Sequence, residues 1–346
     1  MLEQSKKRYR KILFLTWFLT LDLIMFGAFV RLTDSGLGCP DWPGCYASVT
    51  PVGALSEIRQ AVSVMPDGPV TLPKAWIEMV HRYVGALLGF LIICICWMAW
   101  RHRKQFKQTP TLAWIALIAV CIQGAFGAWT VTHKLMPVVV TGHLLGGMLL
   151  LALMTWLAAR EREHSPVAST MKVYKHWMML GFVLLCLQIG LGGWVSTNYA
   201  ALACMDFPTC HGQLIPEMDI SSGYSLIRGL GEMPNGEMIA QPALTAIHWI
   251  HRNFAFLVFI YLGVLAWRMR ADQGLKGPAT LMLSLLFAQL LTGLTTIFFQ
   301  WPLLIAVLHN GGAAGLVLAS VTLLVRLSRA GSTVVRGYPV QSPLIA

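Results

Sequence analysis

The chain has 346 residues, of which 56% are hydrophobic and 12% are charged, and its formal net charge at pH 7 is +11. A soluble domain carries roughly 25% charged residues, so this chain has too little charge to cover a water-exposed surface of its size. The composition therefore excludes an ordinary soluble enzyme, a disordered chain and a collagen, and it indicates an integral membrane protein.

Eight apolar stretches predict transmembrane helices, because about 20 mostly apolar residues are needed to cross a bilayer as a helix. In chain order they are 12–30, 77–100, 112–131, 137–159, 177–196, 244–267, 279–299 and 303–325. The first stretch follows a basic segment, as in a signal peptide, but it is too long for one and no small-residue cleavage site follows it. We therefore expect an all-α integral membrane protein with eight retained transmembrane helices.

The basic residues predict the orientation in the membrane. Most of the 26 lysines and arginines precede the first helix, lie between helices 2 and 3, 4 and 5, and 6 and 7, or follow helix 8. Positive charge concentrates on the cytoplasmic side, so we expect both termini in the cytoplasm of a bacterial-type inner (plasma) membrane. Two long loops, 31–76 and 197–243, then lie on the periplasmic side. The positive charge thus reports topology, and no nucleic-acid partner is expected.

The chain contains an internal duplication. Residues of the same type recur 165 to 170 positions later: Cys39 as Cys204, Cys45 as Cys210, His81-Arg82 as His251-Arg252, His143 as His309, and Gly124 as Gly293. Each half has four predicted helices, an even number, so the two halves have the same orientation. The sequence predicts two four-helix bundles, 1–165 and 166–346, each with its own core and related by a pseudo-twofold axis along the membrane normal.

Four histidines fall inside predicted helices, near their outer ends: His81, His143, His251 and His309. They lie about four to seven residues inside the helix starts, or roughly 6–10 Å at 1.5 Å per residue, so we expect them at similar depth. Ionisable residues in membrane helices usually face the bundle interior. Hydrogen bonding between helices would explain one such histidine. Four paired histidines instead favour two heme irons, each with two axial imidazoles, whereas zinc requires more protein ligands.

The residues beside these histidines differ between the halves. Arg82 and Arg252 each follow a predicted ligand, where a guanidinium could pair with a heme propionate or extend to the membrane interface. Glu78 precedes His81 by three residues, on the same helical face, and its counterpart in the second half is His248. A buried carboxylate beside a heme could move protons or stabilise positive charge. An exposed one would only be solvated at the helix entrance.

Each long loop contains two cysteines six residues apart on the oxidising side of the membrane. A disulfide is therefore predicted within each pair, Cys39 with Cys45 and Cys204 with Cys210. Either disulfide could be a structural staple or take part in redox chemistry. The other four cysteines lie within predicted helices, where we expect small apolar packing residues: Cys94, Cys96, Cys121 and Cys186.

Two motifs resemble those of the heme A synthase family. Arg31-Leu-Thr-Asp-Ser-Gly-Leu-Gly-Cys-Pro-Asp-Trp-Pro-Gly-Cys45 resembles the first-loop signature of that family. Glu78-Met-Val-His81-Arg82 resembles its E-x-x-H-R motif. The duplicated eight-helix layout and the four intramembrane histidines fit the family as well, so the resemblance covers nearly the whole chain.

The resemblance implies an activity that spacing alone does not. Heme A synthases oxidise the C8 methyl group of heme o to a formyl group, by two hydroxylations and loss of water, to make heme a for terminal oxidases. By analogy, the first half holds the substrate heme o near His81 and His143, with Glu78 needed for chemistry. The second half holds a heme b cofactor between His251 and His309, which can relay electrons.

The resemblance also bears on partners and on one alternative ligand. Heme o synthase and oxidase assembly factors are expected partners, in contact with membrane lipid, and a homo-oligomer stays open. His248 is an alternative to His251 as the ligand on its helix, since the two lie about one turn apart. His251 is preferred because His251-Arg252 repeats the His81-Arg82 pair.

Three other classes of protein fit part of the sequence. A bis-histidine diheme membrane cytochrome, which transfers electrons without converting a substrate, would have the same composition and histidines. Only Glu78 and the first-loop signature favour the synthase over it. A thiol oxidoreductase fits the cysteine pairs, but neither pair is Cys-x-x-Cys and the histidines would have no role. A transporter fits the repeat, yet no predicted helix pair is visibly broken.

Overall fold

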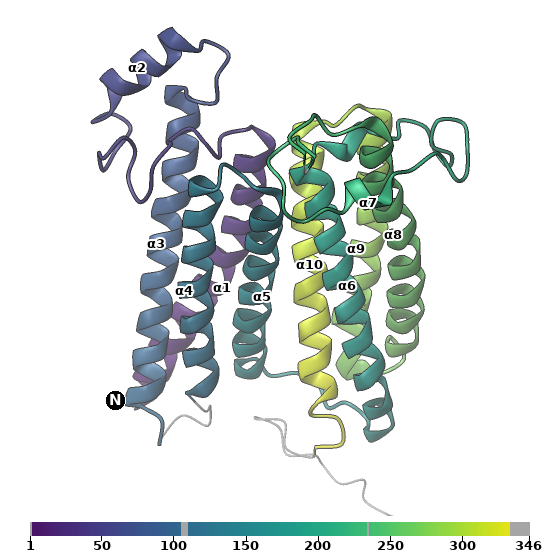
Figure 1. Cartoon of the computed structure of the whole chain (residues 1–346). Helices are drawn as coiled ribbons and strands as arrows, with labels where there is room; N and C mark the ends of the chain where they lie inside the picture. The colour runs from purple at the N-terminus through teal and green to yellow at the C-terminus, as the bar shows by residue number, and fades with distance from the viewer. Residues whose placement is uncertain (1, 105–109, 234, 333–346) are drawn as a thin grey trace, which may run out of the picture.

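The computed structural model describes residues 2–104, 110–233 and 235–332, and within these ranges it contains helices and no β-strand. Eight of the described helices are long and apolar enough to cross a membrane. They are α1 (Leu2–Leu32), α3 (Leu72–Arg101), α4 (Thr111–Thr132), α5 (Pro137–Glu161), α6 (Tyr174–Thr197), α8 (Gln241–Met269), α9 (Gln273–Phe298) and α10 (Leu303–Leu327) (Figure 1). The prediction of an eight-helix, multi-pass membrane protein is confirmed.

Several helices begin earlier than the apolar pattern predicts, because polar residues outside the apolar run continue or cap them. α1 already includes the basic segment before residue 12. α3 begins at Leu72 rather than at residue 77, where the Thr71 hydroxyl accepts the N–H of Lys74 at 3.3 Å. α9 begins at Gln273, where the Asp272 carboxylate accepts the N–H of Gly274 at 2.8 Å.

The two long loops lie at one end of the molecule, opposite the N-terminus (Figure 1). The first carries a helix that the hydropathy pattern does not reveal, α2 (Leu55–Val64), of which Ile58 is buried. The second carries the short helix α7 (Ile220–Gly223). Both predicted disulfides, Cys39–Cys45 and Cys204–Cys210, are present.

Each half of the described chain forms a ring of four helices. In the first half, α3 and α5 each pack against both α1 and α4; in the second, α8 and α10 each pack against both α6 and α9. The halves meet through α1 with α10, α5 with α10, and α5 with α6 (Figure 1). A twofold operation that exchanges α1 with α6 and α5 with α10 converts the α1–α10 contact into the α5–α6 contact and leaves the α5–α10 contact unchanged. The contacts between the halves are therefore consistent with the predicted pseudo-twofold arrangement.

The hydrophobic core differs from the expectation of one separate core in each half. Met154 and Leu157 of α5 belong to the core of the first half. Met148, Leu151 and Ala152 of the same helix join the core of the second half. α5 therefore contributes buried apolar surface to both bundles, and the interface between the halves is continuous with the core.

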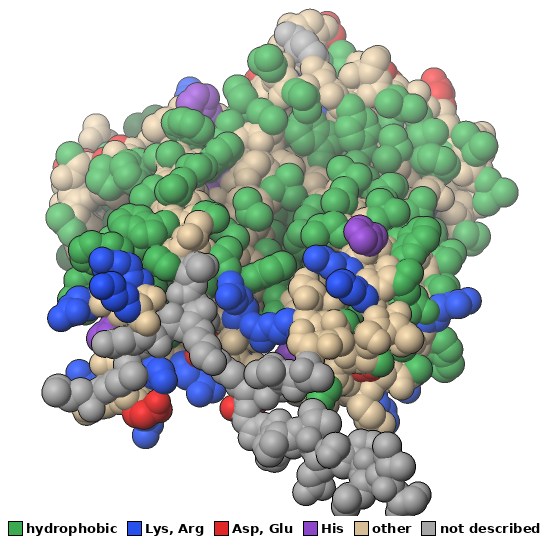
Figure 2. Space-filling view, turned by 90° about the horizontal axis from the view of Figure 1, so that it is seen from below, with side chains coloured by type: hydrophobic (Ala, Val, Ile, Leu, Met, Phe, Trp, Pro, Cys, Tyr) green, Lys and Arg blue, Asp and Glu red, His purple; other side chains and the backbone are tan. Residues whose placement is uncertain are grey.

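Basic side chains gather at the end opposite the long loops. Figure 2 shows lysines and arginines around this end, next to the apolar sides of the bundle. Four of them lie in the last turns of α3, α5, α8 and α10: Arg101, Arg160, Arg268 and Arg326. Following the positive-inside rule, we propose that this end faces the cytoplasm and that the long loops face the periplasm.

Cysteine labelling tests this orientation. Ser56 on α2, Glu217 in the second long loop and Lys104 after α3 are all exposed. A membrane-impermeant maleimide should label the Ser56→Cys and Glu217→Cys variants in intact spheroplasts, and the Lys104→Cys variant only after the membrane is opened. The wild-type chain provides the background, and labelling of Lys104→Cys in intact spheroplasts would reverse the proposed orientation.

Candidate functional site

The four predicted ligand histidines lie on α3, α5, α8 and α10, and each imidazole packs against a glycine of a neighbouring helix. In the first half, a Cβ added to Gly27 would lie 3.0 Å from His81 Cε1, and one added to Gly127 would lie 3.3 Å from His143 Cε1. In the second half, a Cβ added to Gly192 would lie 2.9 Å from His251 Cε1, and one added to Gly293 would lie 3.5 Å from His309 Cε1. Three of these distances are shorter than the ordinary carbon–carbon contact of about 3.5–4.0 Å. The missing side chains therefore make room for the rings.

These glycines follow the internal repeat, with one correction to the sequence prediction. Gly27 and Gly192 are 165 residues apart, and Gly127 and Gly293 are 166 apart. The predicted counterpart of Gly293 was Gly124, but a Cβ at Gly124 would meet no atom within 4 Å. The prediction failed because sequence alone does not show which of two glycines about one turn apart faces the histidine.

The histidines are paired within each half. His81 and His143 lie on α3 and α5, which pack against the same two helices, α1 and α4; His251 and His309 lie on α8 and α10, which both pack against α6 and α9. His143 and His309 follow the first residue of their helices by six positions, as expected. His81 and His251 follow theirs by nine and ten, more than expected, because α3 and α8 begin outside the predicted spans. In the described part of the chain, no three His, Cys, Asp or Glu side chains gather to hold a metal ion.

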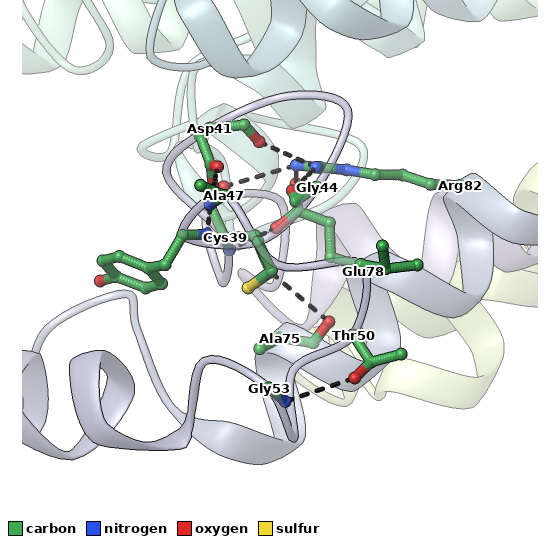
Figure 3. The surroundings of a disulfide bond; sticks show 12 residues. Cys39, Asp41, Gly44, Ala47, Thr50, Gly53, Ala75, Glu78 and Arg82 are labelled. Carbon is green, nitrogen blue, oxygen red and sulfur yellow. Dashed lines mark hydrogen bonds and ion pairs between the residues drawn. A yellow bond between two sulfur atoms is a disulfide. The ribbon is translucent and has the colours of Figure 1, made fainter.

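Glu78 connects the ligand helix α3 to the first disulfide loop (Figure 3). Its side chain is buried, Oε2 accepts the backbone N–H of Cys39 at 2.8 Å, and Oε1 forms an ion pair with Arg82. The alternative of a glutamate solvated at the helix entrance is therefore wrong. Both carboxylate oxygens have partners, so the carboxylate is held in one position about one turn from His81.

His248 occupies the corresponding place in the second half. It is buried, and its Nδ1 accepts the backbone N–H of Cys204 at 3.2 Å. His251 instead packs against Gly192, the repeat counterpart of the Gly27 that contacts His81. This geometry supports His251 as the ligand and gives His248 the loop-binding place that Glu78 has in the first half.

Arg82 and Arg252 bind the disulfide loops rather than extending to the membrane interface. Their guanidinium groups donate to backbone carbonyl oxygens at 2.6–3.5 Å. The acceptors are Cys39, Asp41, Pro43 and Gly44 for Arg82, and Asp206, Pro208 and Thr209 for Arg252. Each arginine thus fastens a loop directly above a predicted ligand, and contact with a heme propionate stays a prediction.

An aspartate organises each disulfide loop from within, a role that the sequence analysis missed. The carboxylate of Asp41 accepts the backbone N–H groups of Tyr46 and Ala47 at 2.6 and 2.7 Å. The carboxylate of Asp206 accepts the Thr209 hydroxyl and the N–H groups of Gly212 and His211, and these bonds hold its pKa well below the usual range. The repeated spacing Cys-x-Asp-x-Pro-x-Cys could have identified both residues.

Exchanging arginine for lysine tests the loop attachment. A lysine keeps the charge but cannot span several carbonyls with a planar fork. In Arg82→Lys, we expect reduction of Cys39–Cys45 by a water-soluble phosphine to accelerate about tenfold, since a hydrogen bond to a charged group contributes about 1.5 kcal/mol or more. Cys204–Cys210 should react at its wild-type rate.

Arg252→Lys is the matched control and should show the opposite pattern. Alkylation of the released thiols followed by mass spectrometry distinguishes the two disulfides. Equal acceleration of both disulfides in either variant would indicate general destabilisation instead of loss of one anchor.

Comparison with known proteins shows similarity along most of the chain. A family model described as cytochrome oxidase assembly protein (COX15-CtaA) matches residues 10–321. A curated protein named heme A synthase, from Shewanella oneidensis, is 39% identical over 317 residues, which cover 89% of this chain and 95% of the relative. The heme A synthase of Halalkalibacterium halodurans is 28% identical, with 83% of this chain and 86% of the relative covered. That of Methylobacterium radiotolerans is 27% identical, with 94% and 91% covered.

Proposed function

The chain belongs to the heme A synthase family, and from this membership we propose that it oxidises the C8 methyl group of heme o to a formyl group. The product, heme a, serves the terminal oxidases. One observation carries the proposal: four imidazoles packed against glycines and paired within each half, with a fixed carboxylate, Glu78, beside only one pair. Two equivalent pairs of histidines would fit an electron-transfer cytochrome. A carboxylate beside only one of the pairs instead fits a protein that converts the heme bound at that pair.

The residues present fit a heme in each half. Each pair supplies two imidazole nitrogens, the donor set of a six-coordinate heme iron. The glycines leave room for the rings, and Nδ1 of His81 and of His143 is buried without a hydrogen-bond partner among the described residues. The two imidazoles of each pair and the space left for them at the glycines support a bound heme in each half.

We assign different roles to the two pairs. His81 and His143 would receive the substrate heme o, and His251 and His309 would hold heme b. Heme b, when bound there, supplies one-electron transfer. Arg82 and Arg252, already fastened to the loops above the ligands, are the proposed contacts for heme propionates.

Glu78 is the proposed catalytic carboxylate. Its Oε1 is paired with Arg82 and its Oε2 with the Cys39 N–H, so the group cannot rotate away from the side of His81. A carboxylate held in place can accept a proton from the reacting carbon substituent or stabilise positive charge that develops there. The second half has an imidazole, His248, at this place instead of a carboxylate, and we therefore assign it no conversion step.

The partners of the reaction follow from its chemistry. Heme o must be delivered by the enzyme that makes it, and heme a must be passed to oxidase assembly, so heme o synthase and oxidase assembly factors are the proposed partners. Both exchanges involve an apolar tetrapyrrole and can take place within the membrane.

Pigment analysis of two variants tests the function and the division between halves. Glu78→Gln should lower heme a formation by about 100-fold or more, the usual effect of losing a general acid or base. Heme o should accumulate, and heme b should stay bound. His309→Ala should remove the low-spin heme b signal from the optical spectrum.

Glu57→Gln, a change at an exposed carboxylate on α2, is the control and should behave as wild type. Heme b as the sole pigment of wild-type protein expressed with a heme o supply would favour the electron-transfer cytochrome. Loss of every heme in Glu78→Gln would contradict the separate roles of the two halves.

A further inference from the structure

In the second half, each ligand imidazole has a polar partner at Nδ1. The Thr292 hydroxyl oxygen lies 2.8 Å from His309 Nδ1, and Gln188 Nε2 lies 3.1 Å from His251 Nδ1. Thr292 donates its own hydroxyl hydrogen to the carbonyl of Ala288 at 2.8 Å. Its oxygen lone pair is therefore directed at His309 as an acceptor, and this matches an imidazole that carries its hydrogen on Nδ1.

In the first half, the repeat places apolar residues where these partners would be. Leu23 corresponds to Gln188 at an offset of 165, and Phe126 corresponds to Thr292 at an offset of 166. Nδ1 of His81 and Nδ1 of His143 are buried and have no partner in the part of the chain that the structure describes. The two halves thus differ at the ligands of α5 and α10, where Thr292 offers an acceptor to Nδ1 and Phe126 cannot.

One polar neighbour in the first half makes a different contact. Gln123 Nε2 donates to the backbone carbonyl of His143 at 2.8 Å and lies 3.5 Å from His143 Nε2, the other ring nitrogen. Gln188 likewise donates to the carbonyl of His251, at 3.2 Å, but it meets that ring at Nδ1. In both of its contacts the Gln188 amide nitrogen is the donor, so His251 Nδ1 is an acceptor, and Gln188 does not supply the acceptor that Thr292 supplies to His309.

A partner at Nδ1 changes how an imidazole binds a metal. A hydrogen bond from Nδ1–H fixes the tautomer with the Nε2 lone pair free, sets the plane of the ring and raises its basicity. Loss of such a partner typically weakens metal binding about 10- to 100-fold. An imidazole without one binds the same iron less tightly and exchanges it more readily.

We propose that Thr292 is a positioning residue that makes His309 a permanent heme ligand, while Phe126, at the same place in the repeat, leaves His143 exchangeable. The proposal rests on the assignment of resident heme to the second half and substrate to the first. A substrate must be released after conversion, whereas a cofactor must stay. The same helical scaffold thus produces both behaviours through the residue beside Nδ1.

Three variants of α9 test the role of Thr292. Thr292→Val keeps the shape of the side chain but removes the acceptor, Thr292→Ser keeps the acceptor, and Thr295→Val is the matched control. The Thr295 hydroxyl also bonds a carbonyl one turn earlier, that of Leu291 at 2.8 Å, without contacting a ligand histidine. In purified holoprotein, transfer of heme b to apomyoglobin should be about tenfold faster for Thr292→Val and unchanged for Thr292→Ser and Thr295→Val.

The reduction potential gives a readout that a loss of packing would not reproduce. A less basic imidazole stabilises ferric iron less, so the heme b potential should rise in Thr292→Val and return to the wild-type value in Thr292→Ser. Wild-type heme transfer and potential in Thr292→Val would overturn the proposal. If Thr292→Val has no effect and the optical spectrum of His309→Ala is also unchanged, the assignment of His309 as a ligand is wrong. If His309→Ala removes the heme signal, only the proposed role of Thr292 is wrong.

The reciprocal change tests the first half. Phe126 Cε1 lies 2.8 Å from the position of a Cβ on Gly142, the residue before His143, so this ring packs beside the first-half ligand. Phe126→Thr should give His143 the acceptor that Thr292 gives His309. We expect more heme o and heme a to remain with the purified protein, at least threefold relative to heme b. An unchanged ratio with normal heme b content would overturn the exchangeable half of the proposal.

Discussion

Four close contacts between an imidazole and a glycine determine how each bundle surrounds its site. Small residues let membrane helices approach closely, and here the space on one helix is filled by a ring from the next. α3, α5, α8 and α10 provide the imidazoles, while α1, α4, α6 and α9 provide the glycines. Every helix of each ring of four therefore takes part, because half of them carry the proposed ligand imidazoles and the other half pack against those imidazoles.

The outer loops depend on the same helices. A charged group near the membrane must be paired or hydrogen-bonded, and Arg82 and Arg252 meet this need with loop carbonyls located about 40 residues earlier in the chain. Glu78 and His248 bind the backbone of the first cysteine of each loop. The position of Glu78, the proposed catalytic carboxylate, thus depends on a loop that a disulfide and an internal aspartate hold closed.

Duplication produced one scaffold, and a few side chains distinguish its halves. Glu78 and His248 occupy equivalent places, as do Leu23 and Gln188, and Phe126 and Thr292. The backbone contacts to the disulfide loops are retained through these changes, so the architecture does not depend on them. They alter instead the polar groups beside the proposed ligands, which is the basis on which we propose that one half takes a substrate heme and the other a resident heme.

The sequence by itself determined the eight membrane helices, the duplication, the disulfide pairs and the four histidines, because hydropathy and repeat spacing are properties of the linear chain. Only the tertiary structure decided that Gly127 rather than Gly124 faces His143 and that the arginines bind loop carbonyls. It also decided that, among the described residues, Thr292 contacts Nδ1 of His309 while Nδ1 of His143 has no partner. Such contacts depend on how each helix is rotated against its neighbour. A rotation of one residue position, about 100°, changes every partner while leaving the hydropathy pattern of the chain unaltered.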